Sequence, residues 1–207
     1  MKLHLLKTPE AHQLINQNSG NVEFFTPPFI VEAARKVMGG IDLDPASCEA
    51  ANRVVKAKRF YTRDNDALAP SAKWRGRVFM NHPFGIAENV CSPIITGKPC
   101  VKKICAKRGY HRAKDYGGNA AWILKLMSSF AKKDVTEAIG ICFASTGEAW
   151  FQPLLTLPLC FLFPRTNYYN NKGKLVKGVT KASVVYYLGR RPDVFRREFS
   201  KFGKVKI

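Results

Sequence analysis

The sequence predicts an α/β protein with an open, mostly parallel sheet, and three observations support this class. Short apolar runs typical of strands alternate with segments of helical periodicity. Polar residues, mainly Asp and Asn, recur where these apolar runs end. The 207 residues with 46% hydrophobic content suit one domain with a sizeable core. Because the carboxyl ends of parallel strands meet at one edge of a sheet, we expect a site along that edge.

Prolines and glycines place the extended lead-in and the first helix. Two successive prolines keep residues 23–28 extended, because proline disfavours the helical conformation in the residue that precedes it. Residues 29–38 carry apolar side chains at helical spacing on one face. Gly39 and Gly40 follow at once, so we expect the helix to end there.

The next elements are three short strands and one helix, and each strand ends in polar residues. The strand over residues 41–47 ends in two acids and a proline, and its final serine can cap a helix over residues 48–56. Residues 58–62 form a second strand, followed by an acceptor-rich turn at residues 64–66. The third strand, residues 77–80, leads directly into a polar tetrapeptide.

An irregular basic segment, residues 86–119, separates these elements from the rest of the chain. It lacks a clear period and carries seven Lys or Arg residues between Cys91 and Lys114, with no acid among them. We therefore expect a single domain over residues 1–207 with this segment inserted into it. After the insertion the pattern predicts a helix at residues 122–132, an interior strand at 138–144 and another strand at 159–165. An aromatic and basic hairpin tip at 166–174 leads to a last strand at 182–188. The basic tail at 190–206 has one apolar helical face. The last two strands are expected to pair as an antiparallel hairpin.

The formal net charge of +19, from 34 Lys and Arg against 15 Asp and Glu, indicates a polyanionic partner. This excess is greater than solubility requires. Nucleic acid is the partner that it favours, and we expect double-stranded DNA. The sequence contains no evident basic helix with a broad apolar face, so a membrane surface is not expected. Nothing in the sequence indicates an obligate protein partner.

The N-terminus and the cysteines bear on the compartment. The apolar stretch in residues 1–9 is too short for a secretory signal, and the longest apolar run, residues 154–163, is interrupted by Thr156 and Pro158. Six cysteines in a chain without an export signal favour reduced thiols over disulfides. We expect a soluble, cytoplasmic protein.

The tetrapeptide Asn81-His82-Pro83-Phe84 is the strongest candidate for a site. It places an amide oxygen, a backbone carbonyl and an aromatic face together at the end of a strand. Pro83 removes one backbone donor and fixes φ, which keeps the His82 carbonyl available as an acceptor. Two acceptors and one aromatic face can hold a flat ring that carries an exocyclic amino group. The alternative is an ordinary turn with Phe84 in the core.

Three motifs in this order resemble the phage-type DNA adenine N6-methyltransferase family, a branch of the S-adenosylmethionine-dependent amino-methyltransferases. They are FFTPP at residues 24–28, IDLDPAS at residues 41–47 and VFMNHPF at residues 78–84. The likeness covers residues 21–85 well, the last strands loosely, and residues 86–119 only in general character. It implies a Rossmann-like methyltransferase fold, adenine-specific DNA methyltransferase activity with S-adenosylmethionine as cofactor, and the host cytoplasm if the chain is phage-encoded.

The resemblance also assigns cofactor contacts. They are Phe25, Thr26, Pro27, Asp44, Pro45, Asp64 and Asp66. Asp44 occupies the position of the methionine-binding loop, and the Thr26 hydroxyl lies where it could bond the cofactor carboxylate. Asp64 and Asp66 resemble the positions that contact ribose and adenine, and which of them does so stays open. For Asp42, a cofactor role and a solvent-facing or capping role are equally open.

The resemblance implies an in-line displacement in which the adenine amino nitrogen attacks the sulfonium methyl. Asn81 Oδ1 and the His82 carbonyl would each accept one N–H of that amino group. Because a duplex hides this nitrogen, we expect the base to flip out and stack on Phe84. One alternative is an RNA amino-methyltransferase, and another is an N4-cytosine amino-methyltransferase, a class that resembles this pattern with serine in place of Asn81. A third alternative is a DNA-binding module whose catalytic motifs have decayed.

The basic insertion is the candidate DNA-contacting segment, since it follows the tetrapeptide and concentrates positive charge beside aromatic residues. The expected contacts are Lys102, Lys103, Lys107, Arg108 and Arg112, next to Tyr110, His111 and Tyr116. A second candidate is the hairpin tip with Tyr168, Tyr169, Lys172 and Lys174, although aromatic residues there are also ordinary strand formers.

The insertion also contains a possible zinc site. Cys91, Cys100, Cys105 and His111 offer thiolate and imidazole ligands suited to a tetrahedral ion. Their separations of eight, four and five intervening residues match no compact zinc knuckle. We therefore expect reduced thiols and a DNA-facing histidine, with structural zinc as the alternative.

Overall fold

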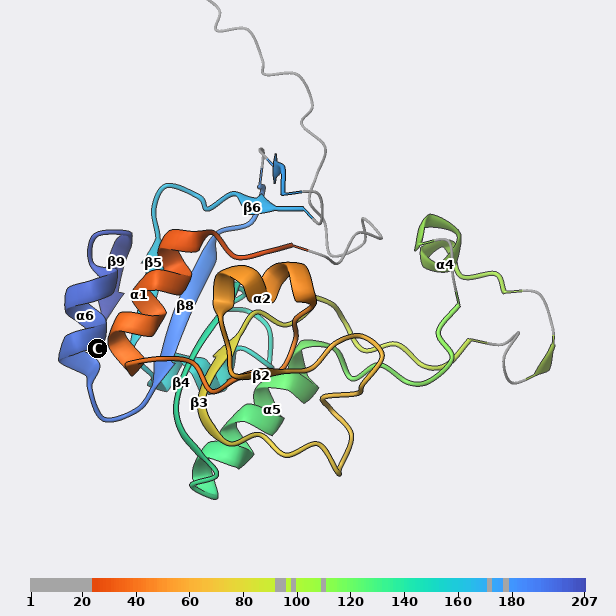
Figure 1. Cartoon of the computed structure of the whole chain (residues 1–207). Coiled ribbons are helices and arrows are strands. Elements are labelled where there is room, and N and C mark those ends of the chain that lie inside the picture. Colours follow the sequence, from red (N-terminus) through yellow and green to blue (C-terminus); the bar gives the residue numbers. More distant parts are fainter. Residues whose placement is uncertain (1–23, 92–95, 98–99, 109–110, 171–172, 177–178) are drawn as a thin grey trace, which may run out of the picture.

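The computed structural model describes residues 24–91, 96–97, 100–108, 111–170, 173–176 and 179–207. These residues build a seven-stranded mixed sheet and a separate two-stranded hairpin (Figure 1). In spatial order the strands of the large sheet are β2 (Arg59–Phe60), β1 (Leu43–Asp44), β3 (Gly76–Met80), β4 (Val135–Phe143), β8 (Ser183–Leu188), β5 (Leu159–Leu162) and β9 (Gly203–Lys206). The hairpin pairs β6 (Tyr168–Tyr169) with β7 (Leu175–Val176).

The large sheet is mostly parallel, which confirms the predicted α/β class. Strands β2, β1, β3 and β4 run parallel to one another. Strand β8 is antiparallel to both of its neighbours, β4 and β5, so that β5 points the same way as β4. The expected antiparallel pairing of the two late strands is therefore present, in the register Cys160↔Val185. Strand β9 then adds an antiparallel edge beside β5.

Helices cover both faces of the sheet (Figure 1). One hydrophobic cluster contains residues of α1 (Pro28–Met38), α2 (Glu49–Val55) and α6 (Pro192–Phe199). The other contains residues of α5 (Gly118–Ala131) and the 3₁₀ helix η1 (Gln152–Thr156). Strand β4 separates the two clusters, because successive side chains of a strand point to opposite faces. Ile139 and Ile141 belong to the first cluster, whereas Ala138 and Cys142 belong to the second.

The first helix matches its prediction in extent and in its stop signal. Pro28 begins the helix, at a position where the absent N–H has no helical partner to lose. Gly39 ends it in the left-handed conformation, at φ 73°, and its N–H donates to the Arg35 carbonyl at 2.7 Å. All the apolar residues of the predicted face are buried.

Two details of the predicted elements are wrong. Helix α2 begins at Glu49, so Cys48 and not Ser47 is its N-cap residue. The Ser47 N–H donates to the Tyr61 carbonyl at 2.9 Å, beyond the ends of β1 and β2. The strand at 182–188 is not the last one, because residues Gly203–Lys206 form β9. Strand β9 alternates half-buried and exposed residues, and in the sequence its lysines resemble a basic tail. Charged residues of this kind are typical of an edge strand. The tail helix is confirmed, with Phe195 and Phe199 fully buried.

The chain order places a switch point at β1. From β1 the chain passes to β2 on one side of it, and then to β3 on its other side. In open α/β sheets, ligands bind in the crevice at the carboxyl ends of strands next to such a point. Asp44 ends β1 and Asn81 follows β3, so both lie at this crevice.

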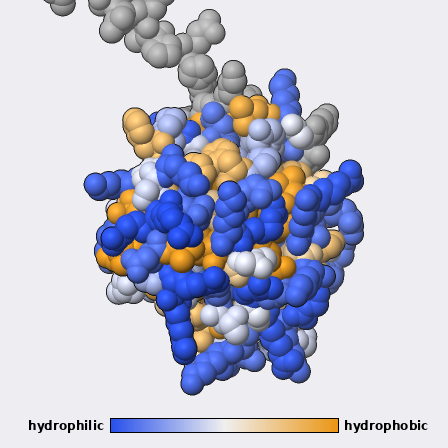
Figure 2. Space-filling view, turned by 60° about the vertical axis from the view of Figure 1, so that its left-hand side comes forward, coloured by the Kyte–Doolittle hydropathy of each residue, from blue (hydrophilic) through white to orange (hydrophobic). Residues whose placement is uncertain are grey.

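The insertion leaves the core after the tetrapeptide and returns at α5. Its two ends form a ribbon, with an antiparallel bridge between Glu88 and Tyr116. The short helix α4 (Lys103–Arg108) lies well away from the sheet (Figure 1). On the face brought forward in Figure 2, hydrophilic side chains predominate, with apolar ones between them. None of the helices in the described parts of the chain is both long and apolar enough to span a bilayer.

Candidate functional site

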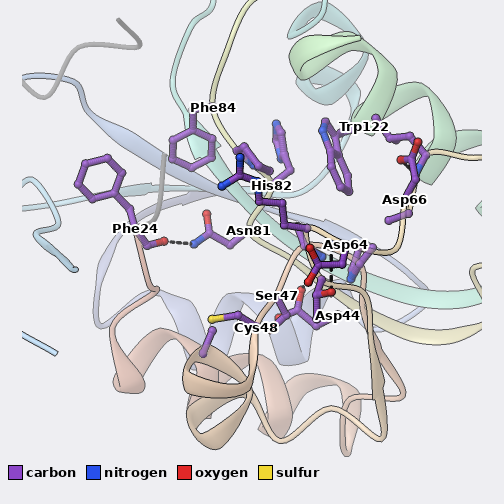
Figure 3. Close-up of a pocket in the computed structure, with 18 of the residues that line it drawn as sticks. Phe24, Asp44, Ser47, Cys48, Asp64, Asp66, Asn81, His82, Phe84 and Trp122 are labelled. Atoms are coloured by element: carbon purple, nitrogen blue, oxygen red, sulfur yellow. Dashed lines mark hydrogen bonds between the residues drawn. The ribbon is translucent and has the colours of Figure 1, made fainter. Parts of the chain in front are cut away.

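A cavity of about 950 Å³ lies at the carboxyl edge of β1 and β3 (Figure 3). This volume lies at the upper end of what small-molecule and cofactor sites occupy. All four residues of the tetrapeptide line it, together with Phe25, Thr26, Asp44, Pro45, Asp64 and Asp66. Pro27 does not line the cavity; it is buried before α1, and its carbonyl accepts a bond from Ile30 N–H at 3.1 Å.

Asp44 is an acid buried at the end of a strand. Its exposed fraction is 2%, and burial raises the pKa of its carboxyl to about 6. The backbone N–H of Ala46, which donates to Oδ1 at 3.1 Å, opposes this rise. A buried carboxylate at a cavity wall has a strong need for a cationic or hydrogen-bonding ligand.

Thr26 contributes a buried hydroxyl to the cavity wall. The residue is 7% exposed, and its Oγ1 has no hydrogen-bond partner among the residues that the structure describes. The neighbouring Phe25 is held by two backbone bonds to Tyr169, at 2.7 and 3.0 Å. The chain beside Thr26 is therefore anchored to the β6–β7 hairpin while the hydroxyl is available to a ligand.

The two acids after β2 have different surroundings. Asp66 accepts a bond from Lys114 Nζ at 2.6 Å and one from Leu68 N–H at 3.0 Å, and the Lys114 contact lowers the pKa of this carboxyl. The exposed Asp64 lines the same cavity, and its own N–H donates to Thr62 Oγ1 at 3.2 Å. Since Lys114 belongs to the insertion, Asp66 joins the insertion to the cavity wall.

The amide of Asn81 has a defined orientation. Its Nδ2 donates to the Phe24 carbonyl at 2.8 Å, which turns Oδ1 away from that carbonyl (Figure 3). Because an amide nitrogen only donates and an amide oxygen only accepts, this bond fixes which end can receive a donor from the cavity. Phe24 lies outside all the predicted site residues, and nothing in its local sequence indicates this contact.

His82 is a buried structural residue. It is 1% exposed, its Nε2 lies 3.0 Å from Asn119 Oδ1, and its ring is stacked on Trp122 at a centroid distance of 6.1 Å. Burial lowers the pKa of the imidazole to about 4, so the ring is neutral at physiological pH. Asn119 also accepts from the Gly85 N–H at 3.4 Å. The side chain of His82 thus ties the tetrapeptide to the start of α5.

The remaining two residues of the tetrapeptide contact the insertion and the core. The Pro83 carbonyl accepts a bond from the Tyr116 hydroxyl at 2.8 Å. Phe84 is half-buried, with its ring packed on Phe143 at 4.5 Å and edge-on to His82 at 5.5 Å. Phe84 therefore packs against the hydrophobic core, as the alternative prediction expected, and it also lines the cavity.

Asp42 has a structural partner instead of a place in the cavity. Its carboxylate receives Arg77 Nε at 2.8 Å and Lys58 Nζ at 2.9 Å, and the Arg77 bond holds the pKa of that carboxyl well below its usual range. Arg77 also donates to the Gly39 carbonyl at 2.7 Å. These contacts join the amino ends of β1 and β3 to the end of α1, so a cofactor role for Asp42 is not supported.

The proposed DNA contacts are placed unevenly. Arg112 lines the cavity, with its guanidinium 4.2 Å from the centre of the Tyr116 ring and 3.6 Å from a Glu88 oxygen. Lys103 is exposed on α4, and Lys102 donates to the Asn89 carbonyl at 3.2 Å. The side chains of Lys107 and Arg108, together with Tyr110 and Lys172, lie outside the described residues.

The hairpin tip is only partly exposed. Tyr168 is 1% exposed, and its hydroxyl is 2.7 Å from Ser183 Oγ, so the reading of this residue as a DNA contact is wrong. Lys174 is exposed and Tyr169 is half-buried. Aromatic residues of the hairpin serve packing, as the strand-former alternative proposed.

The three cysteines and the histidine of the insertion come together. The candidate ligand atoms of Cys91, Cys100, Cys105 and His111 all lie within 4.8 Å of one another. None of the six cysteines, all of which lie in the described residues, forms a disulfide. This geometry brings together the four residues of the zinc alternative, and the expected DNA-facing role of His111 stays a prediction.

Comparisons with models of protein families, with curated proteins and with solved structures find no match for this chain. The candidate site therefore rests on its geometry. Sequence reasoning found the residues at the strand ends, and it missed Phe24, Lys114, Asn119 and Trp122, which reach the site from other segments.

Proposed function

We propose that this chain is a DNA adenine-N6 methyltransferase that uses S-adenosylmethionine. The observation that carries the proposal is the Asn81 amide, whose nitrogen is bound to the Phe24 carbonyl so that its oxygen remains as an acceptor in a large cavity. The sequence resemblance to the phage-type adenine methyltransferases points to the same residue.

The donor set of the cavity fits S-adenosylmethionine. When bound, this cofactor supplies an electrophilic methyl group on a sulfonium sulfur. Asp44 offers a buried carboxylate for its ammonium group, and the unpartnered Thr26 hydroxyl offers a donor for its carboxylate. Of the two acids after β2, Asp64 is the better ribose ligand, because Lys114 and a backbone N–H already engage Asp66. The cavity volume of about 950 Å³ leaves room for the cofactor and an adenine.

The tetrapeptide would position the adenine. Asn81 Oδ1 accepts one hydrogen of the amino group and the His82 carbonyl accepts the other, which orients the nitrogen for methyl transfer. Phe84 offers a ring face supported from behind by Phe143 at 4.5 Å, where a flipped base can stack. The proton that the amino nitrogen loses on methylation leaves to water. The neutral His82 imidazole takes no proton in this scheme; it holds the loop through Asn119.

DNA is favoured as the substrate by charge and by the place of the insertion. The net charge is +19, and Arg112, Lys114 and Tyr116 of the insertion line the cavity. A nucleotide that leaves the helix to enter this cavity would pass these side chains, which can contact its phosphates. Lys114 can do so only by sharing or leaving its contact with Asp66.

The test compares wild type with Asn81→Ala in two measurements. Transfer of labelled methyl from S-adenosylmethionine to duplex DNA, with mass spectrometry of the digested nucleosides, should show N6-methyladenine for the wild type. Loss of one positioned acceptor is expected to lower this rate by at least ~100-fold. Binding of S-adenosylmethionine by calorimetry should stay within about threefold, because Asn81 is assigned to the adenine.

Other outcomes would contradict the assignment. N4-methylcytosine in DNA, or methyl transfer to RNA alone, would assign the site to another substrate. Tight S-adenosylmethionine binding by a wild-type protein that methylates neither nucleic acid would indicate a decayed enzyme. Near-wild-type turnover by folded Asn81→Ala would remove Asn81 from the mechanism.

A further inference from the structure

We infer that Cys91, Cys100, Cys105 and His111 bind one structural Zn²⁺ ion, which organises the basic insertion. The four residues come from three stretches of the insertion that are separated in sequence. Their candidate ligand atoms nevertheless lie within 4.8 Å of one another. Three thiolates and one imidazole are a ligand set that structural zinc sites use.

The distances fit a metal better than a disulfide. Two thiolates bound to one tetrahedral zinc, each at ~2.3 Å, lie about 3.8 Å apart. The Cys91 and Cys105 sulfurs are 3.4 Å apart, which is well beyond a disulfide bond of about 2.05 Å. A small expansion of the cluster would therefore admit the ion.

The burial of these thiols has no explanation in hydrophobic packing. Cys91 is 0% and Cys105 is 3% exposed, yet neither belongs to a hydrophobic cluster of the described residues. The other two buried cysteines, Cys142 and Cys160, both do. Cys142 and Cys160 thus serve as ordinary small apolar side chains, whereas the thiols of the insertion are gathered against one another.

The described residues of the insertion form no apolar core that could hold its shape. Cys91 and Cys105 are the only buried residues that the structure describes between 86 and 117. Two of its described apolar side chains are strongly exposed, Val101 at 93% and Ile86 at 60%. Small modules that bury too little apolar surface are commonly folded by a metal ion instead.

A backbone donor is already directed at the cluster. The Arg112 N–H lies 3.2 Å from Cys91 Sγ, and the Cys91 N–H donates to the Arg112 carbonyl at 3.0 Å. Such N–H contacts to sulfur stabilise a thiolate and orient it toward a metal. The pair continues the ribbon that the Glu88–Tyr116 bridge begins.

The ion would thereby fix the part of the insertion that borders the cavity. Arg112 follows the ligand His111 directly, and its guanidinium is stacked on Tyr116 at 4.2 Å. The Tyr116 hydroxyl holds the Pro83 carbonyl at 2.8 Å. A chain of contacts thus leads from the cluster to the tetrapeptide, and it does not depend on the reaction that the cavity catalyses.

The test is the metal content of the full-length protein. The protein is purified without chelators from cells grown with added zinc, and metals are measured by mass spectrometry. We expect about one zinc per chain, released when the thiols are alkylated under denaturing conditions. Reconstitution of the stripped protein with Co²⁺ should give the strong visible absorption of a tetrahedral cobalt thiolate.

Variants separate ligation from general effects on folding. His111→Ala, a change at an exposed position, should lower the zinc content per chain to below about a third of that of the wild type. His111→Cys should retain the zinc, because a thiolate can replace the imidazole as a ligand. Cys105→Ser should also lose the ion, while Cys48→Ser, outside the cluster, should keep it. Trypsin should cut the insertion of stripped protein faster than that of zinc-loaded protein.

Three results would overturn the inference. One is a folded wild-type protein with less than about a tenth of an equivalent of zinc after growth with the metal. Another is unchanged zinc in both His111→Ala and Cys105→Ser. The third is iron in place of zinc, which would assign the cluster to a different ion.

Discussion

Asp44→Asn should make the free protein more stable while it weakens cofactor binding. Burial raises the pKa of the carboxyl from 3.8 to about 6, so the folded state binds more protons than the unfolded chain between these values. Stability is therefore lost as pH rises through this window, and the full cost is present above about pH 6. At ~1.4 kcal/mol for each pKa unit, the buried charge costs about 3 kcal/mol at neutral pH.

Asparagine removes this cost and can still accept the Ala46 N–H bond, which is 3.1 Å long in the wild type. Urea or thermal unfolding at about pH 7.5 should show a gain of up to about 3 kcal/mol, or roughly 5–10 °C in Tm. At about pH 5 the gain should fall to about half, because wild-type Asp44 is then largely protonated. Under the proposed function, S-adenosylmethionine affinity should fall at least ~10-fold.

The control is Asp64→Asn, which removes an exposed acid from the same cavity and should leave stability unchanged. A loss of stability by Asp44→Asn at about pH 7.5 would falsify the reasoning. So would an equal gain at both pH values, because the gain would then not arise from ionisation.

Two further outcomes are expected. In the Asp44→Asn protein, the free energy of unfolding should fall by about 3 kcal/mol between pH 6.5 and about pH 4, because burial lowers the pKa of His82 from 6.5 to about 4 and the unfolded chain takes up the proton first. Adding His82→Gln should flatten this pH profile in urea titrations. An unchanged profile would mean that another group causes the loss of stability. Tyr116→Phe, which removes the donor to Pro83, should cost about 1 kcal/mol of stability and lower kcat with cofactor affinity unchanged, whereas unaltered kcat would separate the insertion from the tetrapeptide.

Local patterns were sufficient for most of the elements. The period of residues 29–38, with glycines directly after it, predicted α1 to within one residue. The run before Asn81 predicted β3, and the phenylalanine spacing predicted α6. Strand β9 was missed because four residues, in which two lysines alternate with Gly203 and Val205, are too short a pattern to distinguish an edge strand from a basic tail. Its pairing with β5 is a long-range property.

The sequence by itself determined which chemistry stands at the strand ends: an amide, a proline turn and an aromatic ring after β3, and a carboxylate after β1. Only the tertiary structure decided how these groups are oriented and charged. The Phe24 carbonyl turns the Asn81 amide, Asn119 holds His82, and burial raises the pKa of Asp44. The same holds for the cysteine cluster, whose spacing matches no compact motif. Contacts between segments far apart in sequence depend on the path of the chain through space, and no local pattern encodes that path.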